Sequence, residues 1–229
     1  MPNTDRLEAQ VTEEYLVRGI PEPPAGRFIL ILGSSSAGKT STIQNALKSR
    51  PELRLNYDAA LLTTDRFALY TRNLFERADA SYFFPYEVEA ALIRFLQNFS
   101  ADANCLCDQG LYSIWAYSRA IHQRGGLDDH QYQTFYALIL TLGSLAPTPR
   151  VVVRFRCDAA EARRRVEQRG RRHEIVALSE SFIADLDKAY SHVMAAFPGY
   201  VVQYFLDTTY LPPEIVTERF LTILDAHPA

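Results

Sequence analysis

The chain has 229 residues, of which 48% are hydrophobic and 22% charged, the composition of an ordinary globular domain with a sizeable core. Its 24 Lys and Arg against 27 Asp and Glu give a net charge of −3, which argues against a protein that coats nucleic acid and against a polybasic membrane binder. No apolar run approaches the ~18 residues of a membrane span, and the N-terminus lacks the basic and apolar regions of a secretory signal, so we expect a cytoplasmic protein.

The first 26 residues predict an extension that precedes the main domain. Residues 8–17 are compatible with a short helix, and the segment PEPPAG at 21–26 predicts a stiff connector. From residue 27 to residue 229 we expect one domain. It opens with the continuous apolar run 28–32, which predicts a strand buried on both faces of a parallel sheet.

A helix is expected over residues 41–49, and the strand that follows it has two candidates. These are 53–57 and 60–64, which end beside Asp58 and Asp65 respectively. We favour 60–64, because a strand is the better way to bury its apolar side chains. Asp65 then marks a polar strand end that enters a helix.

The rest of the chain alternates between helical and strand patterns. Residues 84–99 have helical spacing, and Asp158 with Glu161 predicts a helix start. Pro213 is placed where a final helix would begin. The other expected strands are 103–107, 151–155 and 200–206, and the other expected helices are 112–122, 129–142 and 181–196. About five alternations predict an α/β fold, a doubly wound five-stranded parallel sheet flanked by helices.

The clearest motif is GSSSAGKT at residues 33–40, a full match to G-x-x-x-x-G-K-[ST] between a buried strand and a helix. Its glycines let successive backbone N–H groups face one concave pocket, and the helix start adds a positive end suited to phosphate. Lys39 is expected to reach the β- and γ-phosphates, and the Thr40 hydroxyl to coordinate Mg²⁺. We therefore expect ATP and Mg²⁺ as cofactors and a nucleotide site formed by Gly33, Ser34, Ser35, Ser36, Ala37, Gly38, Lys39, Thr40 and Ser41.

Other P-loop classes are less compatible with the sequence. GTPases carry an N-K-x-D segment, which is missing, and motor ATPases usually place paired acids after an apolar run. Here the run 105–107 is followed by a single acid, Asp108. It is the candidate to lie beside Mg²⁺ through water, the alternative being a cap on the next turn.

Six arginines lie within ten residues of an otherwise acidic chain and predict a phosphate-binding lid near 163–176. On one helix Arg165, Arg169 and Arg172 are four and three residues apart and share a face, and Gly170 allows the chain to hinge. Guanidinium groups match the charge on a transferring phosphoryl group, so we expect Arg169 and Arg172 to act in catalysis. The two arginines just before Arg165 are expected on a solvated helix face.

These residues together resemble the nucleoside and nucleotide kinase group of P-loop proteins from residue 28 to the end. Some stretches are similar to chloramphenicol phosphotransferase: the loop at 33–39, Arg156-Cys157-Asp158 with Arg165, Arg169-Gly170 and Arg172, and Asp207-Thr208-Thr209. The middle of the chain is more similar to thymidylate and deoxynucleoside kinases, with the segments 108–113 and 116–117 and a helix over 84–95. This resemblance implies acceptor-binding roles for Glu87, Arg94 and Tyr112.

Three departures from those kinases bear on the acceptor. Where they carry an arginine after the acid of the third strand, Gln109 is neutral and cannot make a charged bidentate contact. The Glu-Pro pair that often follows their second strand is missing, and Ile114 stands where deoxynucleoside kinases place an Asp for base recognition. A monophosphate acceptor is therefore less favoured than a neutral hydroxyl compound.

The resemblance implies a phosphotransferase that moves the γ-phosphate of ATP to a hydroxyl of a small molecule, a nucleoside or a natural product. The resembling phosphotransferases use an Asp just past the second strand as base, which implies Asp65, or Asp58 if the strand is 53–57. A thymidylate-type monophosphate kinase and a nucleotide-binding regulatory protein without turnover stay open as alternatives. A homodimer is compatible with the sequence.

Overall fold

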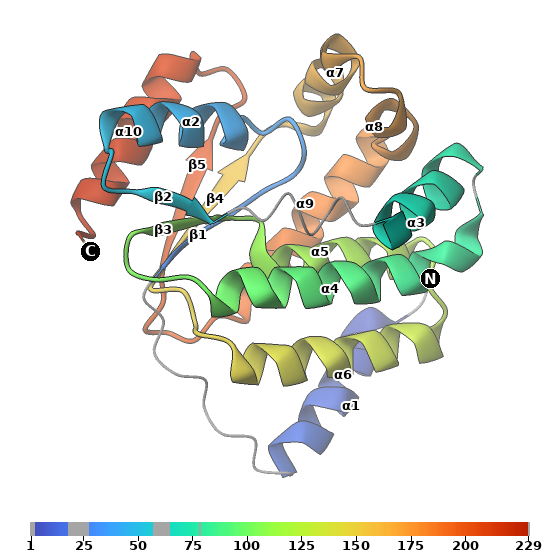
Figure 1. Ribbon diagram of the computed structural model, residues 1–229. Helices are drawn as coiled ribbons and strands as arrows, with labels where there is room; N and C mark the ends of the chain where they lie inside the picture. Colours follow the sequence, from blue (N-terminus) through green and yellow to red (C-terminus); the bar gives the residue numbers. More distant parts are fainter. Residues whose placement is uncertain (1–2, 18–27, 57–64, 78, 229) are drawn as a thin grey trace.

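The computed structural model describes residues 3–17, 28–56, 65–77 and 79–228. At its centre is a five-stranded sheet with strand order β2-β3-β1-β4-β5, in which every pairing is parallel (Figure 1). The expected α/β fold is confirmed. The strands are β1 (Ile29–Leu32), β2 (Arg54–Asn56), β3 (Cys105–Asp108), β4 (Val151–Arg156) and β5 (Val202–Asp207).

Helices cover both faces of the sheet, with α2 and α10 on one side and α4, α5, α6 and α9 on the other (Figure 1). Within the described residues, no helix combines the length and the apolar character that crossing a membrane requires. The helices are α1 (Thr4–Val17), α2 (Lys39–Ser49), α3 (Asp65–Glu76), α4 (Phe83–Phe99), α5 (Gly110–Gln123), α6 (Asp129–Leu145), α7 (Ala159–Arg169), α8 (Arg172–Ala177), α9 (Glu180–Ala195) and α10 (Pro213–Asp225), with a short 3-10 helix η2 (Ala80–Tyr82) before α4.

The continuous apolar run of β1 is explained by its central place in the sheet. Side chains alternate between the two faces of a strand, so Ile29 and Ile31 pack in the core that α2, α7 and α10 share. Leu30 and Leu32 pack in the opposite core, formed with α5, α6 and α9. Both faces are buried, as expected for a parallel sheet.

The second strand differs from the favoured expectation. β2 covers Arg54–Asn56 and pairs with β3, which matches the candidate 53–57, so the choice of 60–64 as second strand is wrong. Residues 60–64 lie outside the described residues, as does the expected connector 21–26. β2 lies at the sheet edge, where polar side chains suffice, and Asn56 donates its side-chain amide to the Gln97 carbonyl of α4.

Helix α1 packs against α6 and α5 rather than standing apart from the sheet domain. Its Glu8 is buried, and its carboxylate accepts hydrogen bonds from four side chains on three other helices. These donors are the Trp115 indole (3.3 Å), Arg119, the Tyr132 hydroxyl and His192 (2.6 Å). The network joins the N-terminal helix to α5, α6 and α9.

Candidate active site

The phosphate loop, residues 33–40, leaves the carboxyl end of β1 and leads into α2. Gly33 has φ +137°, and a Cβ there would lie 2.3 Å from the Phe155 carbonyl oxygen of β4, so only glycine fits. Ser36 and Gly38 also have positive φ, +66° and +85°. The loop has the curled backbone that lets consecutive N–H groups face one point.

Lys39 is buried within this loop, at 6% exposure, and opens α2. Its Nζ donates to the carbonyl oxygens of Gly33 and Ser34, both at 2.7 Å. Burial lowers the pKa of Lys39 to about 8, although the charge of nearby Asp108 partly opposes this shift. The loop's own carbonyls thus position the ammonium group.

A cavity of about 460 Å³, here called the loop cavity, opens beside these residues. Asp108 at the end of β3 lines it, and the Oδ1 atom of this carboxyl is buried without a hydrogen-bond partner in the described part of the chain. A carboxylate oxygen and a threonine hydroxyl are the hard ligands that Mg²⁺ takes in phosphate sites, so Asp108 and Thr40 fit that ion. The loop residues in the lining are Ser35, Ser36, Gly38, Lys39, Thr40 and Ser41.

The arginine-rich lid contributes Arg169 and Arg171 to the loop cavity, together with Glu174, which forms an ion pair with each (3.2 and 3.1 Å). Arg172, the second expected lid residue, is exposed and does not line the cavity. The break that Gly170 allows is present, because α7 ends at Gly170 in the left-handed conformation (φ +73°). A new helix, α8, starts after this break at Arg172. The spacing of three residues therefore no longer places Arg169 and Arg172 on one helix face.

A second cavity of about 560 Å³, here called the aromatic cavity, lies between α4, α5 and the lid segment. Glu87 and Arg94 line it, as the resemblance implied. Tyr112 does not: its ring packs against Phe197 at 4.5 Å in the core, since the cavity is lined by another face of α5. The lining consists mainly of Leu74, Phe83, Tyr86, Ile114, Tyr117, Ile121, Val176, Leu178 and Phe182.

Glu87 is a buried carboxyl in these mostly apolar surroundings, with 2% of its surface exposed. Burial raises its pKa to about 8, and a hydrogen bond from the Ser118 hydroxyl (2.6 Å) only partly opposes that shift. At neutral pH the group is therefore mainly the uncharged acid. It can both donate and accept hydrogen bonds.

The two cavities are contiguous, because Arg94, Gln109 and Tyr117 line both of them. Gln109 has φ +77°, a strained conformation for a residue with a side chain. Its Nε2 donates to the Gly33 carbonyl (3.2 Å) and its Oε1 accepts from the Tyr190 hydroxyl (2.9 Å). The amide thus supports the phosphate loop at the place where the resembling kinases carry an arginine.

Of the two candidate bases, Asp65 and Asp58, the structure describes only Asp65. Asp65 opens α3, is exposed, and lines neither cavity. Asp58 lies outside the described residues. Arg171 and Tyr117 lie in the predicted lid and in the segment 116–117, but no local motif singles them out there, and none marks Tyr190 on α9.

No family model matches the chain, and the search of curated proteins finds no match either. Solved structures do match it. Three are structures of deoxyadenosine kinase from M. mycoides: with the products dCMP and a flexible dCDP, with dCTP, and with dATP. Their identities to this chain are 16%, 18% and 19%, and their TM-scores 0.67, 0.66 and 0.67. In each case the match covers 86% of this chain and 98% of the kinase, so the chain has the P-loop fold of the nucleoside kinases.

Proposed function

We propose that this protein is a P-loop kinase that transfers the γ-phosphate of ATP to a hydroxyl group of a small molecule. The observation on which this depends is the pair of contiguous cavities with a common wall of Arg94, Gln109 and Tyr117. One is built around a phosphate loop, and the other is mostly apolar and large enough for a ring compound. Transfer requires both substrates side by side, and this arrangement supports it.

On the donor side, the loop N–H groups, Lys39, Arg169 and Arg171 supply positive charge around the phosphates. Charge builds up on the transferring phosphoryl oxygens, and preorganised donors stabilise it. Thr40 and Asp108 would hold Mg²⁺, which supplies further positive charge to the phosphate oxygens when bound.

On the acceptor side, we propose a nucleoside, in keeping with the names of the three matched kinases. A flat ring suits the aromatic lining, and Glu87 is the buried group able to hydrogen-bond to its edge. For the base we propose an aspartate after β2. Parallel strands end at one edge of a sheet, so β2 ends on the same side as the phosphate loop. Asp58 follows the last residue of β2 by two positions and Asp65 by nine, which favours Asp58.

The test is a transfer assay with the full chain, labelled ATP, Mg²⁺ and a panel of nucleosides, nucleoside monophosphates and hydroxylated antibiotics. We expect a labelled nucleoside monophosphate from at least one nucleoside. Transfer of the label only to compounds that were added as nucleoside monophosphates would indicate the thymidylate-type alternative. Tight ATP binding without transfer to any compound would indicate a regulatory protein and overturn the proposal.

In the same assay, the Glu87→Gln variant tests whether the aromatic cavity binds the acceptor and the loop cavity binds ATP. It should raise the KM for the nucleoside and leave the KM for ATP nearly unchanged, because Glu87 lines only the aromatic cavity. Glu52→Gln is the control, since Glu52 lies on the surface and lines neither cavity. An unchanged nucleoside KM in Glu87→Gln would remove the aromatic cavity as the acceptor site.

A further inference from the structure

A loop that turns its N–H groups toward phosphate must turn carbonyl groups the other way, and each needs a hydrogen-bond donor when buried. In this loop the carbonyls of Gly33 and Ser34 accept from Lys39. The carbonyls of Ser36 and Ala37 point to another part of the molecule. Their donors lie outside the loop and outside α2.

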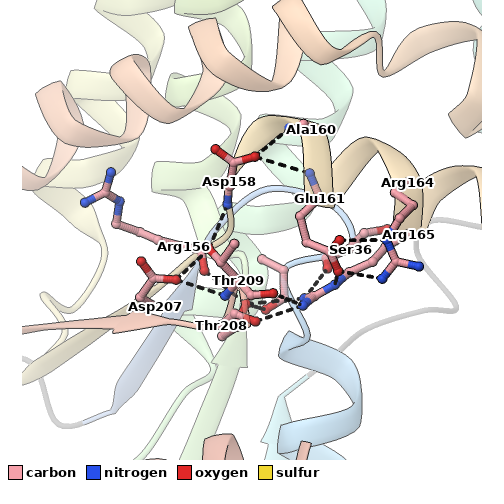
Figure 2. A network of polar contacts seen from close by, with 11 residues as sticks. Ser36, Arg156, Asp158, Ala160, Glu161, Arg164, Arg165, Asp207, Thr208 and Thr209 are labelled. Carbon is pink, nitrogen blue, oxygen red and sulfur yellow. Dashed lines mark hydrogen bonds and ion pairs between the residues drawn. The ribbon is translucent and has the colours of Figure 1, made fainter. Parts of the chain in front are cut away.

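Arg165 of α7 is the donor to Ser36. Its guanidinium lies 3.4 Å from the Ser36 carbonyl oxygen and donates to the carbonyls of Thr208 (2.8 Å) and Thr209 (2.9 Å), while its Nε donates to Glu161 (2.8 Å) (Figure 2). One side chain thus connects the phosphate loop, the segment after β5 and the lid helix. A planar group with five N–H donors is suited to such a junction.

Thr208 completes the junction beside the next loop residue. Its side chain is buried, and its hydroxyl lies 3.1 Å from the Ala37 carbonyl oxygen and 3.0 Å from that of Arg156. The segment 208–209 is further fixed by Asp207, which accepts from the backbone N–H (2.9 Å) and hydroxyl (2.6 Å) of Thr209 (Figure 2). The outer side of the phosphate loop therefore packs on a segment that Arg165 holds in place.

We propose that Arg165 is a positioning residue for nucleotide binding: through Ser36, and through Thr208 on Ala37, it fixes the conformation in which the loop N–H groups face the phosphates. This inference rests on the proposed function, since the loop must bind ATP for its conformation to matter. Ser36 has φ +66°, which a non-glycine residue adopts at a cost, and surrounding contacts must maintain it. Arg165 also lies one helical turn before Arg169, so it fixes the base of the lid to the loop that the lid faces.

The neighbouring residue provides a matched control. Arg164 has the same partner, Glu161, through two hydrogen bonds of 2.7 Å, but it is exposed and, in the described part of the chain, forms no hydrogen bond with the loop or with residues 208–209. Arg165→Gln and Arg164→Gln therefore remove the same charge from the same helix. Arg165 differs from Arg164 in its contacts to the loop and to residues 208–209 and in its greater burial.

The experiment measures MgATP binding by titration calorimetry and the KM and kcat for both substrates. We expect Arg165→Gln to weaken ATP binding by about 10- to 100-fold, the effect of losing hydrogen bonds from a charged donor. The KM for the acceptor should stay near that of the wild type. Arg164→Gln should bind ATP within about twofold of the wild type. Equal ATP affinities for the two variants would overturn the proposal, while absence of ATP binding by the wild type would contradict the proposed function instead.

Two further variants separate positioning from stability. In Arg165→Lys one ammonium replaces the planar fork, and we expect intermediate ATP affinity. Thr208→Val keeps the shape of a buried side chain but removes the hydroxyl beside Ala37, so it should weaken ATP binding even if Arg165→Gln does not fold. A Thr208→Val protein with wild-type ATP affinity would overturn the proposal. So would variants with a lowered Tm but an unchanged KM for ATP.

Discussion

Replacing Glu8 by Gln tests whether α1 is an integral part of the fold. The wild-type carboxylate is buried and accepts from four side chains, of which Arg119 carries a permanent charge. Burial alone would raise the pKa of Glu8, but the hydrogen bonds from His192 and Tyr132 and the charge of Arg119 outweigh it, so its pKa is lowered. Gln keeps the size of the side chain and an acceptor oxygen but removes the charge.

The magnitude follows from the geometry. Removing one partner of a buried ion pair costs about 3–5 kcal/mol. Gln still accepts from some donors, and exposed Asp5 still pairs with Arg119, so we expect a loss of about 2–4 kcal/mol in the free energy of unfolding. For a chain of this size that lowers Tm by roughly 5–15 °C.

Urea unfolding followed by tryptophan fluorescence is the assay, because Trp115 is the only tryptophan in the sequence and its indole donates to Glu8. Asp5→Asn is the control, since Asp5 contacts the same Arg119 but is 76% exposed and should contribute about 0.5 kcal/mol or less. If both variants unfold at the same urea concentration, the docking of α1 through Glu8 is refuted.

The effect of Glu8→Gln on the free energy of unfolding should depend on pH. The folded-state pKa of Glu8 lies below its ordinary value of 4.5, so its contribution is complete above that pH. As the pH falls below about 4.5, the unfolded chain takes up a proton before the folded chain does, and the contribution declines. The stability difference between wild type and Glu8→Gln should therefore shrink in acid.

Three further predictions concern the candidate active site. Lys39→Ala should lower kcat by about 10²-fold or more, because the charge nearest the phosphates is lost; initial rates within about fivefold of the wild type would contradict the loop assignment. Of the variants Asp58→Asn and Asp65→Asn, tested in parallel, one should lower kcat by roughly 10²- to 10⁴-fold with little change in the KM for ATP, because it removes the base. If both variants are active, neither aspartate is the base. Proteolysis near Arg169 and Arg171 should slow only when ATP and acceptor are both bound, because closure makes contacts in that state alone; equal cleavage rates would favour a solvated helix.

The parts of the fold that depend on local pattern could be predicted from the sequence. The apolar run of β1 and the GSSSAGKT motif place a phosphate loop at the end of a central strand, and the structure has it there. Helix boundaries near Asp158 and Pro213 follow from residues that favour helix starts, and both are confirmed. In these cases neighbours in the sequence determine the structure.

The predictions from the sequence are wrong where the structure depends on a contact between distant residues or on a break in a helix. β2 has two polar residues in three, and its strand conformation depends on pairing with β3, some fifty residues later. Arg172 was predicted in the site because spacing was counted through Gly170, whose left-handed conformation ends α7. Tyr112 was chosen over Tyr117 because the sequence does not say which face of α5 lines a cavity.

The docking of α1 also bears on how the chain folds while it is being made. Glu8 is synthesised 184 residues before its partner His192, an interval of roughly 10–40 s at ordinary rates of translation. Until α5 and α6 have been made, about a hundred residues or more after Glu8, α1 lacks the helices on which it packs, and an isolated helix of 14 residues is marginal in water. We expect α1 to reach its native position later than it is translated, and to be available to chaperones in the meantime.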